Sequence, residues 1–160
     1  MNKLSKQKIF FLLLLIAIII FFGYLRDFIF LHINREIGIQ YYKMTKDDIP
    51  TSIAWMKNFN YLQLEKFKWF FTFLFSGIYL LLTILVTKIL FAKKSYLKLC
   101  IYAYIALFTI AFVFMGCGYL FHSFNLKGYD LSRSLMHIAQ SPFVMMVLIP
   151  AFKLSEKKAV

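Results

Sequence analysis

LCIYAYIALFTIAFVFMGCGYLF, Leu99 to Phe121, carries no charged side chain and decides the class of fold. As an α-helix this stretch rises about 35 Å, which is enough to cross a hydrocarbon core of about 30 Å. Its apolar residues form an unbroken block and lack the half-polar period of a helix on a soluble protein. The stretch therefore predicts a transmembrane helix.

Three further apolar blocks surround it in the sequence. Two cover residues 9–25 and 69–87, and the last, SLMHIAQSPFVMMVLIPAF over 134–152, contains two prolines but no residue that must be ionised. In lipid, a helix bundle can satisfy the backbone groups that Pro142 frees. The composition agrees, because 61% of the residues are hydrophobic and 20% are aromatic. We expect an all-α, polytopic membrane protein whose residues 1–160 form one membrane domain with four transmembrane helices.

The first block has a second interpretation, because lysines followed by an apolar run also describe a secretory signal. Cleavage requires small residues after the run. Here the sequence IIIFFGYLRD places bulky side chains around Gly23. A retained signal anchor is therefore favoured over a cleaved signal.

The basic residues predict the orientation. Short loops rich in Lys and Arg stay in the cytoplasm. More than half of the 19 Lys and Arg residues lie in the termini and the short second loop: Lys3, Lys6, Lys8, Lys88, Lys93, Lys94, Lys98, Lys153, Lys157 and Lys158. We expect both termini to be cytoplasmic, and we attribute the net charge of +12 to this topology and not to a nucleic-acid partner.

The segment 26–68 between the first two blocks mixes aromatic with charged residues. Helices that lie at a membrane interface have this composition. We expect an outer amphipathic, interfacial loop region, and a partner-binding loop is the alternative.

Small and hydroxyl-bearing residues recur at helical spacing in the second and third blocks. Such residues permit close approach of helices in membranes. In the second block they are Thr72, Ser76, Tyr79, Thr83 and Thr87, within an arc of about 80°. In the third they are Tyr102, Ala106, Thr109, Val113 and Gly116, ending at Gly116, Cys117 and Gly118. We predict that these two stripes pack together.

The last block carries a polar face. Its members, spaced by one turn or less over about 100° of a helix, are Asp130, Arg133, His137, Gln140 and Ser141. Ionisable residues inside a membrane mark functional sites, although a polar residue that faces a bundle is often only a hydrogen-bond bridge. We take these five residues as candidates for a partner interface.

Three chemical alternatives use the same region. Cys117, Arg133 and His137 occur in the order found in exosortases, which are membrane cysteine transpeptidases, but those enzymes have more helices and spread the three residues over several of them. A metal or haem site is disfavoured because His122 and His137 alone are too few ligands. A Cys100 to Cys117 disulfide is excluded, since one helix holds these residues about 26 Å apart. An oligomeric transporter or channel subunit stays open.

The sequence KKSYLKLCIYAYIALFTIAFVFMGCGYLF, followed by SRSLMHIAQSPFVMMVLIPAF, resembles the small membrane proteins of the exosortase F system over roughly residues 69–152. The shared features are a basic turn, an aromatic-rich span, a short loop with arginine and a final span ending in Pro150, Ala151 and Phe152. The resemblance implies an accessory role beside a protein-sorting enzyme in the bacterial inner membrane. It implies no catalytic residue.

We therefore expect a non-enzymatic inner-membrane accessory protein that binds other integral membrane proteins, an exosortase among them, and the lipid bilayer. We expect no catalytic residue, metal or cofactor. An exosortase-like cysteine transpeptidase is the alternative.

Overall fold

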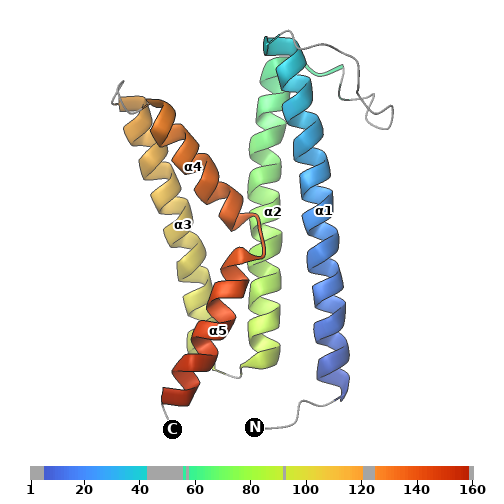
Figure 1. Cartoon of the computed structure of the whole chain (residues 1–160), viewed down its shortest axis with the longest axis vertical. Helices are drawn as coiled ribbons and strands as arrows, with labels where there is room; N and C mark the ends of the chain where they lie inside the picture. The colour runs from blue at the N-terminus through green and yellow to red at the C-terminus, as the bar shows by residue number, and fades with distance from the viewer. Residues whose placement is uncertain (1–5, 43–55, 57, 92, 121–124, 159–160) are drawn as a thin grey trace. The chain divides into compact units, whose positions relative to one another are not determined.

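The computed structural model of the chain describes residues 6–42, 56, 58–91, 93–120 and 125–158. These residues form five α-helices and no strand (Figure 1): α1 Lys6–Tyr42, α2 Tyr61–Leu90, α3 Lys94–Leu120, α4 Asn125–Ala139 and α5 Phe143–Lys158. The all-α class is confirmed. Helices α1, α2 and α3 are each long and apolar enough to cross a membrane, and α4 with α5 passes the same test as one bent pair.

The chain divides into two compact units. Each unit contains part of α1 and part of α2. One unit comprises Met1–Ile19 and Ser76–Val160, and the other is Ile20–Phe75. We describe each unit by itself.

In the unit Ile20–Phe75, α1 continues well past the end of its apolar block at Leu25. An apolar stripe along this extension packs against Met56 and the first half of α2; it comprises Ile29, Ile33 and Ile37, which face Phe67 and Phe71. The expected loop over 26–68 is therefore helical over 26–42 and 61–68, and residues 43–55 and 57 lie outside the described part. The mixture of charged and aromatic residues predicts helices that lie at the membrane interface, but the isoleucines at a spacing of four give the α1 extension a face that is buried against α2.

The start of α2 is fixed by a reciprocal cap. The backbone N–H of Gln63 donates to the carbonyl of Asn60 at 2.9 Å, and the Gln63 side-chain oxygen accepts from the Asn60 N–H at 2.9 Å. A Gln at the third helical position that reaches back to the cap satisfies a backbone donor that would otherwise be free. Helix α2 therefore begins eight residues before the apolar block at Trp69.

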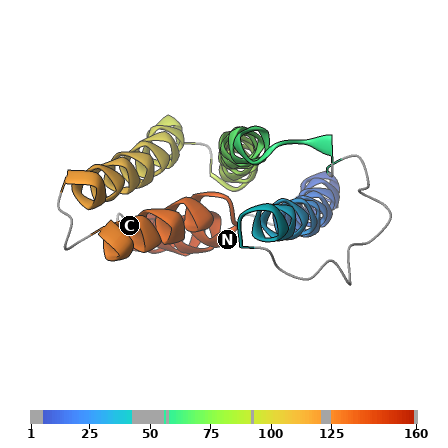
Figure 2. The ribbon, with the colours of Figure 1, turned by 90° about the horizontal axis from the view of Figure 1, so that it is seen from above.

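In the other unit, α3 and α4 form an antiparallel hairpin, and the α4–α5 pair runs beside α3 (Figures 1 and 2). At the far end of this unit, aromatic rings join the turn between α2 and α3 to α5. Phe91, Tyr96 and Phe152 are all buried there, above the fully buried Cys100.

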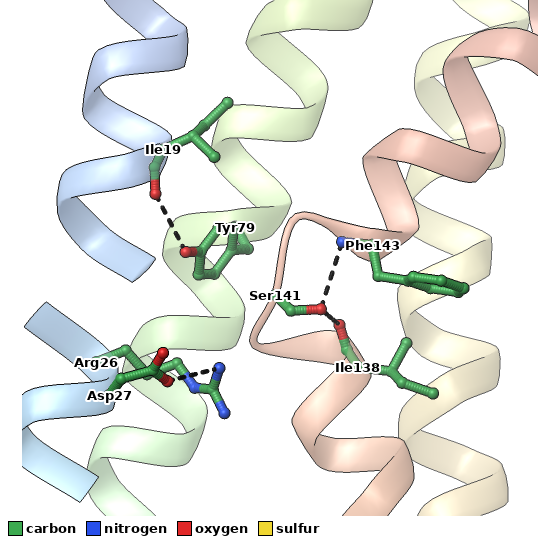
Figure 3. Close-up of polar contacts among 7 residues, drawn as sticks. All are labelled: Ile19, Arg26, Asp27, Tyr79, Ile138, Ser141 and Phe143. Atoms are coloured by element: carbon green, nitrogen blue, oxygen red, sulfur yellow. Dashed lines mark hydrogen bonds and ion pairs between the residues drawn. The ribbon is translucent and has the colours of Figure 1, made fainter. Parts of the chain in front are cut away.

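The polypeptide bends by 62° between α4 and α5. Pro142 has no N–H and cannot donate to the carbonyl of Ile138. The Ser141 hydroxyl donates to that carbonyl at 2.8 Å, the Ser141 N–H does so at 3.1 Å, and the hydroxyl oxygen accepts from the Phe143 N–H at 3.3 Å (Figure 3). The predicted span over 134–152 therefore consists of two helices joined by a bend, because serine and proline together end α4 and start α5.

If proline causes the bend, Pro142→Ala should straighten the pair, because an alanine at this position would donate the missing N–H to the Ile138 carbonyl. Spin labels at the exposed positions Leu131 and Leu154 would report this change, in a background with both cysteines replaced by serine. The separation should grow from about 30 Å to about 35 Å, given a rise of about 1.5 Å per residue. Pro150→Ala is the matched control, since α5 continues through Pro150. An unchanged distance in the Pro142 variant would contradict this explanation.

Candidate functional site

The polar stripe of α2 is buried along its whole length: Thr72, Ser76, Tyr79, Thr83 and Thr87 each expose 7% of their surface or less. Two of its hydroxyls donate to carbonyls one turn earlier, from Thr72 to Lys68 at 2.9 Å and from Thr83 to Tyr79 at 2.7 Å. A hydroxyl that is satisfied within its own helix can be buried at little cost. The stripe therefore packs as a small-residue surface.

Three members of this stripe also reach neighbouring helices within their unit. The Tyr79 hydroxyl donates to the Ile19 carbonyl of α1 at 3.3 Å (Figure 3). The Thr83 hydroxyl lies 3.3 Å from the Tyr104 hydroxyl, and that of Thr87 lies 3.5 Å from the Cys100 sulfur. Hydrogen bonds between apolar helices stabilise their association by about 0.6 kcal/mol each. These contacts hold helices together.

The face of α3 that meets α2 is not the predicted one. Tyr102, Ala106, Thr109, Val113 and Gly116 are all exposed, whereas Cys100, Tyr104 and Ala111 are buried. The predicted pairing of the two stripes is therefore wrong. Both faces of α3 carry small and aromatic residues at helical spacing, so spacing alone did not distinguish them.

Helices α3 and α4 approach each other closely at Gly118 and Gly128. A Cβ placed on Gly128 of α4 would come within 2.8 Å of the Phe114 carbonyl oxygen and 2.9 Å of the Gly118 Cα. Within the predicted triplet, Gly118 is therefore buried at the contact, Cys117 is half-buried, and Gly116 is exposed with no atom within 4 Å of an added Cβ. The packing role predicted for Gly116 is not seen within one chain.

This contrast gives a matched pair of substitutions. Gly128→Ala should destabilise the chain by about 1–3 kcal/mol, because the backbones of α3 and α4 would have to separate. Gly116→Ala should be neutral or stabilise it by up to about 1 kcal/mol, through helix propensity alone. The unfolding midpoint in an SDS titration measures both. Equal midpoints for the two variants would show that the glycine contact does not hold the hairpin.

The polar face of the last block is divided by the bend. Asp130, Arg133 and His137 lie on α4 and are exposed, whereas Gln140 and Ser141 lie beyond the end of α4. Gln140 is buried, and Ser141 forms the turn. The structure therefore keeps only the first three residues together on one exposed helix face.

The position of this exposed face along α3 follows from the contact between Gly118 and Gly128. Gly128 lies against Gly118, near the end of α3, and α4 runs back along α3 from there. His137 is then about 14 Å and Arg133 about 8 Å along α4 from the contact. His137 is thus level with the middle of the apolar stretch of α3.

The same geometry separates Cys117 from His137, which would have to lie close together in an exosortase-like cysteine transpeptidase. Cys117 neighbours the contact at Gly118, so His137 lies roughly 14 Å further along the hairpin axis. A base must lie within about 3.2 Å of the thiol that it activates. Cys100 and Cys117 are both free thiols.

Sequence reasoning missed a second polar set, which lies on the extension of α1. Arg26, His32 and Glu36 are buried. Arg26 pairs with Asp27 at 3.2 Å (Figure 3), and its guanidinium lies 5.9 Å from the centre of the Phe30 ring. Because the charges along this segment predict a surface at the membrane interface, we did not expect these residues to be buried.

These side chains are satisfied close by. The His32 Nδ1 lies 2.6 Å from the Phe28 carbonyl, which can only accept, so this nitrogen carries the proton. Gln40 donates to Glu36 at 3.4 Å and to the Phe59 carbonyl at 2.8 Å. The set therefore ties the α1 extension to the residues before α2.

Among the described residues, no three His, Cys, Asp or Glu side chains gather in a way that could hold a metal ion. No family model matches the chain, and neither a curated protein nor a solved structure matches it.

Proposed function

We propose that this chain is a non-enzymatic, four-span integral membrane protein that acts as an accessory subunit. It binds another integral membrane protein through the exposed face of its α3–α4 hairpin. The proposed site consists of Asp130, Arg133 and His137 on α4. The exposed small residues of α3 form a second packing surface, on the side of α3 away from its glycine contact with α4.

The exposed apolar residues support the membrane location. Phe10, Leu13 and Ile20 of α1 each expose more than 60% of their surface, and Ile105 and Val113 of α3 more than 50%. Each such side chain is worth about 1.5–3 kcal/mol when it leaves water. A chain with apolar residues exposed along whole helices is adapted to a lipid solvent.

The exposed polar face of α4 carries the proposal of a partner. Arg133 and His137 are exposed at the level of the apolar stretch of α3. A charged side chain that faces hydrocarbon at that depth costs several kcal/mol, and both Asp130 and Arg133 are exposed on this face. A second protein that covers this face would remove the cost.

The exposed face of α3 favours a helix as a binding partner. Ala106, Thr109 and Gly116 are exposed and small, and the Thr109 hydroxyl already donates to the Ile105 carbonyl at 2.8 Å. Small residues allow another transmembrane helix to approach closely. The resemblance to exosortase F accessory proteins makes a sorting enzyme in the bacterial inner membrane the first partner to test.

Site-specific photo-crosslinking in living cells tests the interface. A photoreactive residue at position 133 or 137 should crosslink to a protein, whereas one at Leu13, on the exposed face of α1, should label lipid only. Arg133→Leu with His137→Leu should lower the protein crosslink from position 130, on the same face of α4, at least tenfold at equal membrane abundance. Lipid labelling alone at positions 133 and 137 would exclude the proposed interface.

Cys117→Ser distinguishes an interface from a thiol enzyme. A small residue at this position keeps the helix contact, so crosslinking from position 137 and the growth of a complemented deletion strain should stay unchanged. A serine cannot replace a thiolate nucleophile. Loss of growth at normal abundance would favour the enzyme.

The proposed topology places both termini and residues 92–98 in the cytoplasm and residues 26–68 outside. A periplasm-active reporter fused after Lys46 should work, and one fused after Lys94 should not. Activity in the reverse order would overturn the four-span topology.

A further inference from the structure

Lysines gather where α2, α3 and α5 meet at one end of their unit. Five are described there, and all are exposed: Lys88, Lys93, Lys94, Lys98 and Lys153. The only acid of the described residues in these helix ends is the half-buried Glu156. We call these five lysines the basic end.

A buried aromatic cluster joins the helices at the basic end. The rings of Tyr96 and Phe152 stack at 4.5 Å between centroids, and Phe91 packs edge-on to both, at 5.5 Å and 5.8 Å. Phe152 directly precedes Lys153, and Tyr96 lies between Lys94 and Lys98 in sequence. Lysines from two distant segments are thereby held around one buried core.

The lysines of α3 are not placed to stabilise their own helix. The amino end of a helix carries a partial positive charge, so cations in its first turns are unfavourable. Helix α3 has Lys94 and Lys98 there and no acid in its first turn. Lys93 lies 5.7 Å from the centre of the Tyr96 ring, which directs one charge along the surface of the cluster. An anion bound from outside the protein would relieve the repulsion between these lysines and the partial positive charge at the amino end of α3.

We infer that the basic end binds the headgroups of anionic phospholipids in the membrane that the helices cross. The inference rests on the proposed membrane location. The phosphate of a lipid is fixed in the layer where the ends of transmembrane helices lie, and clusters of four to eight basic residues beside a span recognise anionic lipid. Each lysine near such a surface strengthens binding about fivefold.

Native mass spectrometry of the full chain, released from nanodiscs, measures lipid retention. The nanodiscs contain either phosphatidylcholine alone or phosphatidylcholine with one fifth phosphatidylglycerol. The chain should retain phosphatidylglycerol well above its share of the bilayer. Lys94→Gln with Lys98→Gln should reduce the affinity for phosphatidylglycerol relative to phosphatidylcholine by about 25-fold, because each lysine contributes about fivefold. Retention in proportion to the lipid mixture would overturn the inference.

Matched variants separate charge from folding. Lys94→Arg with Lys98→Arg keeps both charges and should keep the preference. Lys57→Gln with Lys66→Gln removes the same charge from the segment between α1 and the apolar block of α2 and should leave the preference unchanged. An equal loss in both glutamine pairs would assign the effect to net charge and overturn the inference. If polyglutamate displaces the bound lipid, and lipid does not displace bound polyglutamate, the basic end binds an acidic protein instead. That result would also overturn the inference.

Alkaline extraction of cell membranes distinguishes this inference from the proposed function. A chain that leaves the membrane at high pH is not integral, and the four-span proposal then fails. A chain that stays in the membrane but shows no lipid preference contradicts only the lipid site.

Discussion

Backbone polar groups surrounded by apolar side chains must find their hydrogen bonds within the protein, and this constraint governs the present structure. Long continuous helices meet it by construction. Side-chain hydroxyls among apolar residues also need partners within the protein. Four of them donate to backbone carbonyls one turn earlier: those of Thr72, Thr83, Thr109 and Ser134. At the 62° bend the same constraint favours serine beside proline, because Pro142 cannot donate to the Ile138 carbonyl and both the N–H and the hydroxyl of Ser141 donate to it instead. The bend divides α4 from α5 and places the polar residues of α4 on a helix of their own.

Helix α3 has two faces that differ in their packing. One face, with Cys100, Tyr104 and Gly118, closes against α2 and α4 of the same chain. The other, with Ala106 and Gly116, is equally suited to close packing and stays exposed. Gly116 and Gly118 are two residues apart and therefore point to nearly opposite sides of the helix. A single chain uses one glycine of this pair, and the proposed partner would use the other.

The sequence predicted the apolar helices well, because block length and the absence of charge are strong signals. It also singled out the α2 stripe, whose five members are all buried. It did not predict the extension of α1, since the charges after Leu25 conceal the isoleucine stripe that packs there. It indicated an interruption at Pro142 but not the size of the bend, which depends on local hydrogen bonds. The choice between the two faces of α3 requires knowledge of the neighbouring helices, which spacing alone does not supply.

Helix α3 connects the proposed lipid site at the basic end with the proposed partner site on α4. Helix α3 runs from Lys94 to Leu120, a length of about 40 Å, so in a bilayer its lysines and its glycine contact lie near opposite surfaces. Anionic headgroups at Lys94 and Lys98 would fix the depth of the helix, and the Gly118–Gly128 contact transmits that depth to α4. His137 then lies about 14 Å inward from the contact and cannot reach either surface with its short side chain. The proposed attraction between the lysines and the headgroups would be screened by salt over about 8 Å, whereas the glycine contact is not. High salt should therefore loosen the lipids while the α3–α4 hairpin and its exposed histidine stay in register.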